Sequence, residues 1–215
     1  MTPDLLAQIL PLQETTPALF ITAAVAAYLI GCIPFAVVVS RAFGLADPRS
    51  FGSGNPGATN VLRTGNKLAA LLTLLGDAAK GAIAIGVAAL MGIPADLLGW
   101  IGLIAFLGHV FPVTLGFKGG KGVSTSAGVL LALYCPLGLA TLGTWLFMAF
   151  TLRYSSLSAI TAAALAPIYA VLMGLPTPVI VPVTLMASIL LIKHAGNFRR
   201  LLAGQESKIG SKKKS

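Results

Sequence analysis

The residues best suited to hold a phosphate lie in one stretch, 108–126, which reads GHVFPVTLGFKGGKGVSTS. Glycine lets consecutive backbone N–H groups point towards one anion, and the start of a following helix adds donors and a positive dipole end. Lys121, between Gly120 and Gly122, supplies a mobile positive charge and is the lysine expected to contact the ligand. The stretch predicts a phosphate site at a membrane surface, with a simple structural turn before a helix as the alternative.

This stretch is not a nucleotide-binding P-loop. That motif requires Ser or Thr directly after its lysine and a glycine five residues before Gly120. Gly122 and Leu115 occupy these two positions, and no strand pattern precedes them. The other lysine of the stretch, Lys118, is expected to be a surface charge or a contact to a lipid headgroup.

A second glycine-rich segment, 47–63, reads DPRSFGSGNPGATNVLR. Its glycines permit tight turns, its Ser, Thr and Asn side chains are neutral donors, and Arg49 and Arg63 offer guanidinium groups suited to phosphate. A connecting loop with a helix cap near Thr59 or Asn60 is the alternative interpretation.

Two further polar clusters follow. The segment 153–158, RYSSLS, precedes an apolar run, where a serine either caps a helix or donates to a phosphate. In the segment 193–200, KHAGNFRR, helical spacing places His194 and Asn197 on one face, together with Arg200 or Leu201. Juxtamembrane arginines are by default contacts to anionic lipid.

Asp77 and Lys80 are three residues apart inside an apolar segment, so mutual neutralisation is expected to outweigh a catalytic role. His109 is as well explained by a hydrogen bond to a nearby loop as by catalysis. Two histidines and the unspaced Cys32 and Cys135 form no metal-ligand set, so no metal and no cofactor are expected.

The composition predicts an all-α integral membrane protein. The 215 residues are 56% hydrophobic and 10% charged, and apolar runs of membrane-spanning length recur. We expect a compact bundle of seven transmembrane helices in one domain, residues 1–203, followed by a basic cytoplasmic tail, 204–215. The expected spans are about 17–42, 68–91, 95–115, 122–133, 137–152, 157–174 and 179–195.

Seven spans segregate the charges. All Lys and Arg residues except Lys80 then fall on one side, in the glycine-rich loops and the C-terminal segment, whereas the other side carries only Asp4, Glu14 and Asp96. The positive-inside rule places the basic loops and the C-terminus in the cytoplasm and the N-terminus outside. The tail lysines 212–214 are expected to have no catalytic role.

The candidate site is rich in cationic, hydroxyl and N–H donors but has no evident nucleophile–base pair or unpaired carboxylate. Such a site suits a reaction between two phosphorylated substrates, one already activated, with the donors clamping and orienting them. A lipid-embedded site also suits a substrate with a hydrocarbon chain. The alternatives are a small phosphate or organophosphate transporter, disfavoured because polar residues gather at one face, and a lipid-binding scaffold.

Three motifs, in order along nearly the whole chain, resemble the bacterial acyl-phosphate-dependent glycerol-3-phosphate acyltransferase family. They are GSGNPGATN at 52–60, GH at 108–109 with GFKGGKG at 116–122, and His194-x-x-Asn197-x-x-Arg200. The resemblance implies a seven-helix enzyme of the bacterial inner membrane whose active site faces the cytoplasm. It implies transfer of a fatty acyl group from acyl phosphate to the 1-hydroxyl of sn-glycerol 3-phosphate, giving lysophosphatidic acid and phosphate, the first step of phospholipid synthesis.

The resemblance also implies the site residues. Glycerol 3-phosphate would be held by Ser53, Arg63, Lys121, Ser156, His194 and Asn197, of which Ser53, Arg63, Lys121 and Ser156 are the catalytic candidates. The acyl phosphate would be cradled by Gly54, Asn55, Gly57, Thr59, Asn60, Gly119, Gly120 and Gly122. The family is thought to use no protein base, a substrate phosphate taking the hydroxyl proton.

The chain departs from the family at two positions. Cys32 stands where Ser is common, for which we expect a packing change, and Arg199 stands where a neutral residue is frequent. The second departure leaves open whether Arg199 or Arg200 faces the site. Membrane lipid and the two substrates are the expected partners, with no nucleic acid, and the protein is expected to be a monomer or a weak dimer.

Overall fold

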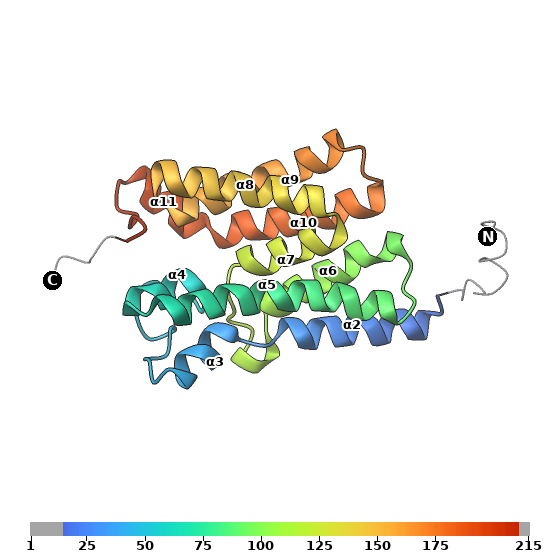
Figure 1. Ribbon diagram of the computed structural model, residues 1–215, viewed down its shortest axis with the longest axis horizontal. Coiled ribbons are helices and arrows are strands. Elements are labelled where there is room, and N and C mark those ends of the chain that lie inside the picture. Colours follow the sequence, from blue (N-terminus) through green and yellow to red (C-terminus); the bar gives the residue numbers. More distant parts are fainter. Residues whose placement is uncertain (1–14, 211–215) are drawn as a thin grey trace.

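The computed structural model describes residues 15–210, and every regular element within that range is helical (Figure 1). The elements are α2 (Pro17–Gly31), α3 (Phe35–Ala42), α4 (Ala58–Val61), η1 (Leu62–Thr64), α5 (Lys67–Leu90), α6 (Ala95–Val110), η2 (Val113–Leu115), α7 (Val123–Leu133), α8 (Cys135–Leu152), α9 (Ser155–Leu172), α10 (Thr177–Lys193) and α11 (Ala195–Leu202). Residues 1–14 and the lysines predicted to form a tail at 212–214 lie outside the described range.

The described helices include several that could cross a membrane. Helices α5, α8 and α9 and the segment Ala95–Leu115 are long and apolar enough. The pairs α2 with α3 and α10 with α11 pass the same test together, bent by 41° and 54°. Four to six candidate spans confirm an all-α chain of multi-pass character. The count of seven needs the 11-residue α7 as well and stays a prediction.

The first predicted span, 17–42, is broken between α2 and α3. Pro34 precedes α3 and has no backbone N–H, so the helical hydrogen-bond ladder cannot continue through it. The Nζ of Lys80 donates to the carbonyl of Ile33 at 2.8 Å, which satisfies a carbonyl that the break frees. A run of apolar residues therefore indicated the length of this segment but not its interruption.

The last predicted span, 179–195, also differs in detail. Helix α10 ends at Lys193, two residues before the predicted end of the span, and the chain bends by 54° into α11, a bend that the sequence pattern had not indicated. The polar segment between the first two predicted spans contains two short helices, α4 and η1, which lie at the polar end of the bundle. No serine caps α9, because its N-cap is Tyr154, which makes no side-chain capping bond.

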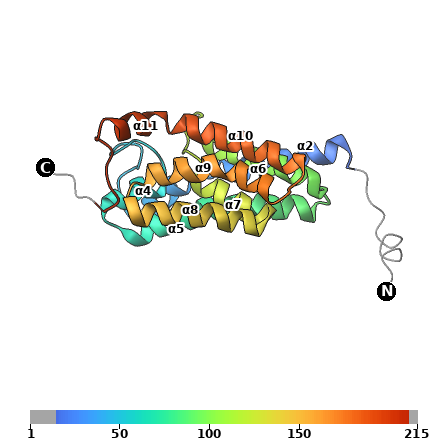
Figure 2. The ribbon, with the colours of Figure 1, turned by 90° about the horizontal axis from the view of Figure 1, so that it is seen from above.

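The helices form two groups with α7 between them. Helices α2, α5 and α6 pack together on one side, and α8, α9 and α10 on the other. Helix α7 contacts both α5 and α8, and α6 also packs directly against α10 (Figure 1). Seen from above, α4 and α11 lie at the same end of the bundle, far from the first turn of α2 (Figure 2). Residues of α4 and α11, from two distant polar segments, are thereby gathered at that end.

Glycines bring the α5–α7 and α2–α6 pairs into backbone contact. A Cβ on Gly128 would lie 1.9 Å from the carbonyl oxygen of Ala78, and a Cβ on Gly81 would lie 2.5 Å from that of Thr125. A Cβ on Gly31 would likewise lie 2.1 Å from the carbonyl oxygen of Ala105. Small residues allow such close approach in membranes, where packing rather than water exclusion holds helices together. These contacts fix α6 and α7, the helices that flank the central loop.

Replacing Gly128 with alanine is expected to destabilise the fold. The added methyl group would meet the backbone of α5, which cannot give way as a flexible side chain can, so a loss of roughly 1–3 kcal/mol is expected. Thermal unfolding in detergent would measure this as a lower Tm. Gly143→Ala is the matched control, since a Cβ there meets nothing within 4 Å, and its Tm should be unchanged or slightly higher. Equal Tm values for both variants would contradict the proposed packing.

Candidate functional site

The first glycine-rich loop is held in shape by Asn60. Its amide nitrogen donates to the carbonyls of Pro48 and Phe51 at 2.6 and 3.1 Å. Its side-chain oxygen accepts from the backbone N–H of Ser53 at 3.2 Å and from Arg63 at 3.0 Å. These four bonds use the whole hydrogen-bonding capacity of a buried amide side chain. In this arrangement Asn60 shapes the loop, and its predicted contact to an acyl phosphate stays untested.

The same loop is joined to two distant segments. Arg63 donates its second terminal nitrogen to the hydroxyl of Ser207 at 2.9 Å. The hydroxyls of Thr59 and Ser155 lie 3.1 Å apart, which ties α4 to the first turn of α9. Gly52 adopts a φ of +61°, and a Cβ there would lie 2.8 Å from the Arg63 guanidinium, so the turn leaves room for that side chain.

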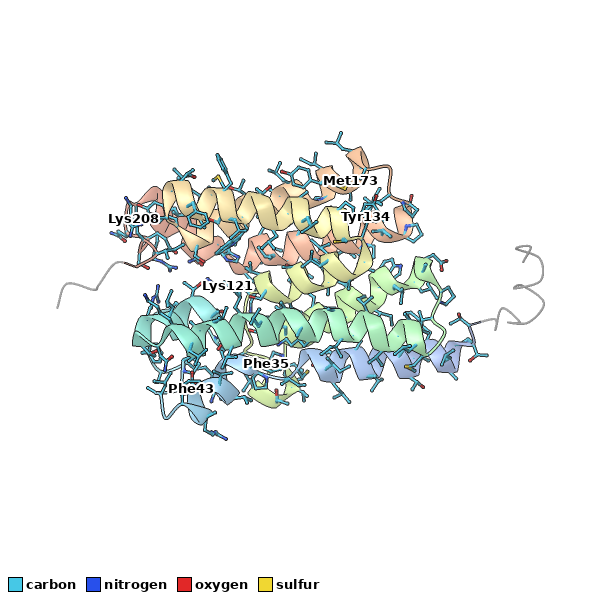
Figure 3. The ribbon with its side chains drawn as sticks, in the orientation of Figure 1. Phe35, Phe43, Lys121, Tyr134, Met173 and Lys208 are labelled. Atoms are coloured by element: carbon cyan, nitrogen blue, oxygen red, sulfur yellow. The ribbon has the colours of Figure 1, made fainter. Side chains whose placement is uncertain are left out.

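The central loop folds back on the end of α6. The N–H of Gly119 donates to the carbonyl of Val110 at 3.2 Å, and the N–H of Gly120 donates to that of His109 at 3.1 Å. These two amides therefore serve the turn itself in this structure, and their predicted contact to an acyl phosphate stays a prediction. Gly122, with a φ of +89°, is the N-cap of α7 and turns the chain into that helix. Lys121 projects from this turn between the two groups of helices (Figure 3).

Lys121 begins a polar cluster that converges on the carboxylate of Glu206. The Nζ of Lys121 donates to the side-chain oxygen of Asn197. The Asn197 amide and the Ser156 hydroxyl both donate to Oε1 of Glu206, at 2.6 and 2.8 Å. Arg200 donates its Nε to Oε2 of the same carboxylate at 2.7 Å. One anion is thus surrounded by hydroxyl, amide and guanidinium donors from α9 and α11.

His194 lies beside this cluster at the junction of α10 and α11. Its side chain is buried, and Nδ1 is 2.9 Å from the carbonyl oxygen of Leu190. Because a carbonyl only accepts, Nδ1 must carry the proton, and Nε2 is the ring atom left to face another group. Of the two arginines of α11, it is Arg200 that reaches the cluster.

Burial and neighbouring charges set the protonation of the cluster. Burial lowers the pKa of the Lys121 ammonium to about 8; Glu206 opposes this shift, and Arg200 and Arg63 add to it. Burial alone would raise the pKa of the Glu206 carboxyl, but hydrogen bonds from Asn197, Ser156 and Arg200 outweigh it and hold that pKa below its ordinary value. A dianionic group entering the cluster would meet the positive charges of Lys121, Arg200 and Arg63. Among the charged groups of this cluster, only the Glu206 carboxylate offsets them.

The predicted residues therefore gather to different degrees. Lys121, Ser156 and Asn197 are linked through Asn197 and Glu206, and Arg63 joins the same end through Ser207. The hydroxyl of Ser53 accepts from the N–H of Asn55 within its own loop, at 3.4 Å. Among residues 15–210, no group of three or more His, Cys, Asp or Glu side chains is placed to hold a metal ion.

Sequence reasoning missed Glu206 and Ser207, which it had assigned to a basic tail. One feature of the sequence could have drawn attention to Glu206. Glu206 is the only acidic residue after Asp96, and it stands among lysines and arginines. An isolated acid in a basic segment often has a structural partner, but the sequence pattern does not indicate which groups it meets.

An all-α membrane protein whose polar end gathers donors around a carboxylate is the class that these features define. The family model described as glycerol-3-phosphate acyltransferase matches residues 21–204, and the chain belongs to that family. It is 59% identical over 193 residues to the glycerol-3-phosphate acyltransferase of Dechloromonas aromatica, covering 90% of this chain and 98% of the relative. The corresponding protein of Burkholderia orbicola is 58% identical over 196 residues, covering 90% of this chain and 94% of the relative.

Two solved structures share the fold. Both are crystal structures of PlsY (YgiH), an integral membrane glycerol 3-phosphate acyltransferase. The glycerol 3-phosphate form gives a TM-score of 0.83 at 37% identity, covering 89% of this chain and 96% of the other. The lysophosphatidic acid form gives 0.82 at 36%, covering 89% and 95%. The chain described here is an integral membrane protein of this fold.

Proposed function

We propose that this protein transfers a fatty acyl group from an acyl phosphate to the 1-hydroxyl of sn-glycerol 3-phosphate. The observation that carries the proposal is the set of Lys121, Asn197, Ser156 and Arg200 around one carboxylate, because the same donors suit a phosphate. The names of the relatives, and the glycerol 3-phosphate form of a solved one, support the acceptor.

The chemistry needs little from the protein beyond positioning and charge. The hydroxyl oxygen attacks the acyl carbonyl carbon, a new ester C–O bond forms, and the bond from that carbon to the phosphate oxygen breaks. Inorganic phosphate leaves with the electron pair, and the hydroxyl proton passes to a substrate phosphate oxygen. An acyl phosphate is already activated, so a clamp of donors that aligns the reactants and stabilises the oxyanion suffices. No protein general base takes part.

The two substrates divide the site in this proposal. Lys121, Arg63, Ser53 and Ser156, with His194 and Asn197, hold glycerol 3-phosphate. The two glycine-rich loops take the phosphoryl end of the acyl phosphate. The residues assigned to this role are Gly54, Asn55, Gly57, Thr59, Asn60, Gly119, Gly120 and Gly122. Asn60 acts by shaping the first loop, and Gly119 and Gly120 act by shaping the turn before Lys121. Arg200, which donates to Glu206, is added to the glycerol 3-phosphate side. The apolar surface of α8, where Phe147 and Phe150 are exposed, suits surrounding lipid.

We place the site on the cytoplasmic side of the bacterial inner membrane. Seven crossings, with α7 as a short one, put the start of α2 outside and α11 inside. The positions of these two helices at opposite ends of the bundle support this topology (Figure 1). The positive-inside rule supports it too, because the basic loops share the end that carries α4 and α11. Residues 204–215 then continue on the cytoplasmic side, and a monomer or weak dimer suffices.

The decisive experiment offers purified protein glycerol 3-phosphate with palmitoyl phosphate, palmitoyl-CoA or palmitoyl carrier protein in separate reactions. Phosphate and lysophosphatidic acid should appear one-to-one with palmitoyl phosphate alone. Lysophosphatidic acid formed from palmitoyl-CoA or palmitoyl carrier protein would contradict the assignment of acyl phosphate as the acyl donor. If folded protein forms no product with any of the three donors, the proposed acyl transfer is wrong. Uptake of glycerol 3-phosphate into sealed proteoliposomes would then test transport.

The lowered pKa of Lys121 predicts how activity depends on pH. The protonated lysine is the active form, and it predominates below its pKa of about 8, so kcat/KM should fall above pH 8, approaching tenfold per pH unit. In Lys121→Arg the guanidinium stays charged, so this fall should vanish even if overall activity is lower. Rates from pH 6.5 to 9.5, corrected for spontaneous acyl phosphate hydrolysis, would measure it. The same midpoint in both proteins would contradict the assignment.

A further inference from the structure

Three buried titratable side chains lie beside the site but take no part in the proposed reaction. Asp77 and Lys80 of α5 are each 2% exposed, and His109 of α6 is 8% exposed. Lys80 Nζ is 2.7 Å from Oδ1 of Asp77, and Nδ1 of His109 is 3.5 Å from the same oxygen. Buried ionisable groups within an apolar bundle are costly, and mutual neutralisation explains why they are tolerated but not why they are there.

The lysine of this cluster reaches the break in the first helix pair. Besides Asp77, it donates to the carbonyl of Ile33 at 2.8 Å, and its Nζ lies 5.9 Å from the centre of the Phe35 ring. Ile33 and Phe35 stand on either side of Pro34, where α2 gives way to α3 (Figure 3 labels Phe35). Helix α3 leads directly into the first glycine-rich loop. Lys80 thus holds the start of α3, the helix whose far end carries that loop.

The histidine of the cluster supports the central loop. A Cβ on Gly120 would lie 2.1 Å from Nε2 of His109, and the carbonyl of His109 accepts the N–H of Gly120. The glycine pair therefore lies directly on this residue, one position before Lys121. Any shift of the imidazole away from Asp77 would change the surface on which Gly120 rests.

The two loops meet over the cluster. A small cavity of about 10 Å³, roughly the space of one water molecule, is lined by all three titratable residues. Gly119 and Gly120 of the central loop and Pro56 of the first loop line it as well. One buried cluster thereby touches the break of the first helix pair and both glycine-rich loops.

We propose that Asp77, Lys80 and His109 form a positioning network that sets the two glycine-rich loops relative to each other. The inference rests on the proposed function, because it assigns these residues to the substrate-binding geometry of that reaction. They touch neither substrate. A pair that only neutralised itself would need no donor to Ile33 and no histidine under Gly120, and either connection moves a loop if it is lost.

The test separates positioning from stability by removing the lysine alone and then the whole Asp77–Lys80 pair. Lys80→Met leaves the Asp77 carboxylate buried without its lysine, so the Tm should fall. The KM for at least one of the two substrates should also rise, because the lysine no longer holds Ile33. The double variant Asp77→Leu/Lys80→Met leaves no unpaired charge, and such replacement of a buried ion pair is often neutral or stabilising. Its Tm should recover, while the KM for at least one substrate stays fivefold or more above wild type and kcat remains within twofold.

A double variant whose KM and Tm both return to wild-type values would overturn the proposal, since the pair would then serve stability alone. Should that protein not purify as a folded species, His109→Gln decides: a fivefold rise in KM supports the proposal, and a KM within twofold of wild type overturns it. Thr73→Val is the matched control, because Thr73 is buried on α5 one turn away and bonds only the carbonyl of Ala69. Wild-type protein in the same assay keeps a failure of the proposed function distinct, since it would then show no turnover.

Discussion

Lys121→Ala should lower kcat/KM about 100-fold, and at least tenfold, while leaving the protein folded in detergent. The ammonium group is the charged donor of the central loop that reaches Asn197, and a hydrogen bond to a charged partner contributes roughly 1.5–3 kcal/mol. Release of phosphate and lysophosphatidic acid, measured over a range of both substrates, would give kcat and KM separately. Circular dichroism and Tm would establish that the fold is intact.

Lys118→Ala is the matched control for this result. Lys118 has the same charge, lies in the same loop three residues earlier, and is exposed. Its removal should change kcat/KM by less than twofold, because surface charges contribute little. Activity of Lys121→Ala above about one tenth of wild type, or an equal loss in both variants, would remove Lys121 from the proposed site.

Glu206→Ala is the second large effect, and it should appear in both stability and activity. The Glu206 carboxylate accepts from Ser156, Asn197 and Arg200, and its side chain is only 8% exposed. Removing it strands three donors, so Tm should fall by roughly 5–10 °C, as expected for about 2–3 kcal/mol in a protein of this size. The kcat/KM should fall at least tenfold, because Ser156 and Asn197 lose the group that orients them.

Two companion variants sharpen this prediction. Glu206→Gln keeps the shape of the side chain and one acceptor oxygen but lacks the negative charge. If its NH₂ group faces Arg200, two donors meet. The decreases in Tm and kcat/KM should therefore be smaller than in Glu206→Ala. Gln205→Ala alters the exposed neighbouring residue and should leave both Tm and kcat/KM unchanged. Unchanged Tm and activity in Glu206→Ala would show that the carboxylate contributes neither order nor stability to the cluster.

Local patterns indicated several of the polar residues that gather in the cluster, because their residue types and spacing lie within short segments. Glycine beside lysine at 119–122, and Asn197 three residues after His194, indicated donors for an anion without any knowledge of the fold. Periodicity could not indicate Glu206, since a carboxylate that binds Ser156 and Asn197 joins segments distant in the chain. Nor could a motif show that Asn60 has all its hydrogen bonds inside its own loop.

The positions of the long helices could be predicted from the sequence, but the breaks and bends between them could not. Apolar runs predicted long helices because a hydrocarbon core demands them, and α5 and α8 lie close to the expected ranges. Hydropathy averages over a window, so it passed through the break at Pro34 and merged α2 with α3. The last span was expected to end at 195, close to the end of α10, but a polar helical pattern at 193–200 does not indicate the bend that turns Asn197 and Arg200 towards Glu206.

The return of the chain after α11 has a consequence for how the protein is made. Glu206 and Ser207 follow every membrane helix in the sequence, yet they bond to Ser156 and Arg63, which are synthesised much earlier. A nascent chain that has already inserted α2 to α10 still lacks the acid that gathers the donors. Because segments emerge from the ribosome in order, the polar cluster around Glu206 is completed only after the membrane helices are in place.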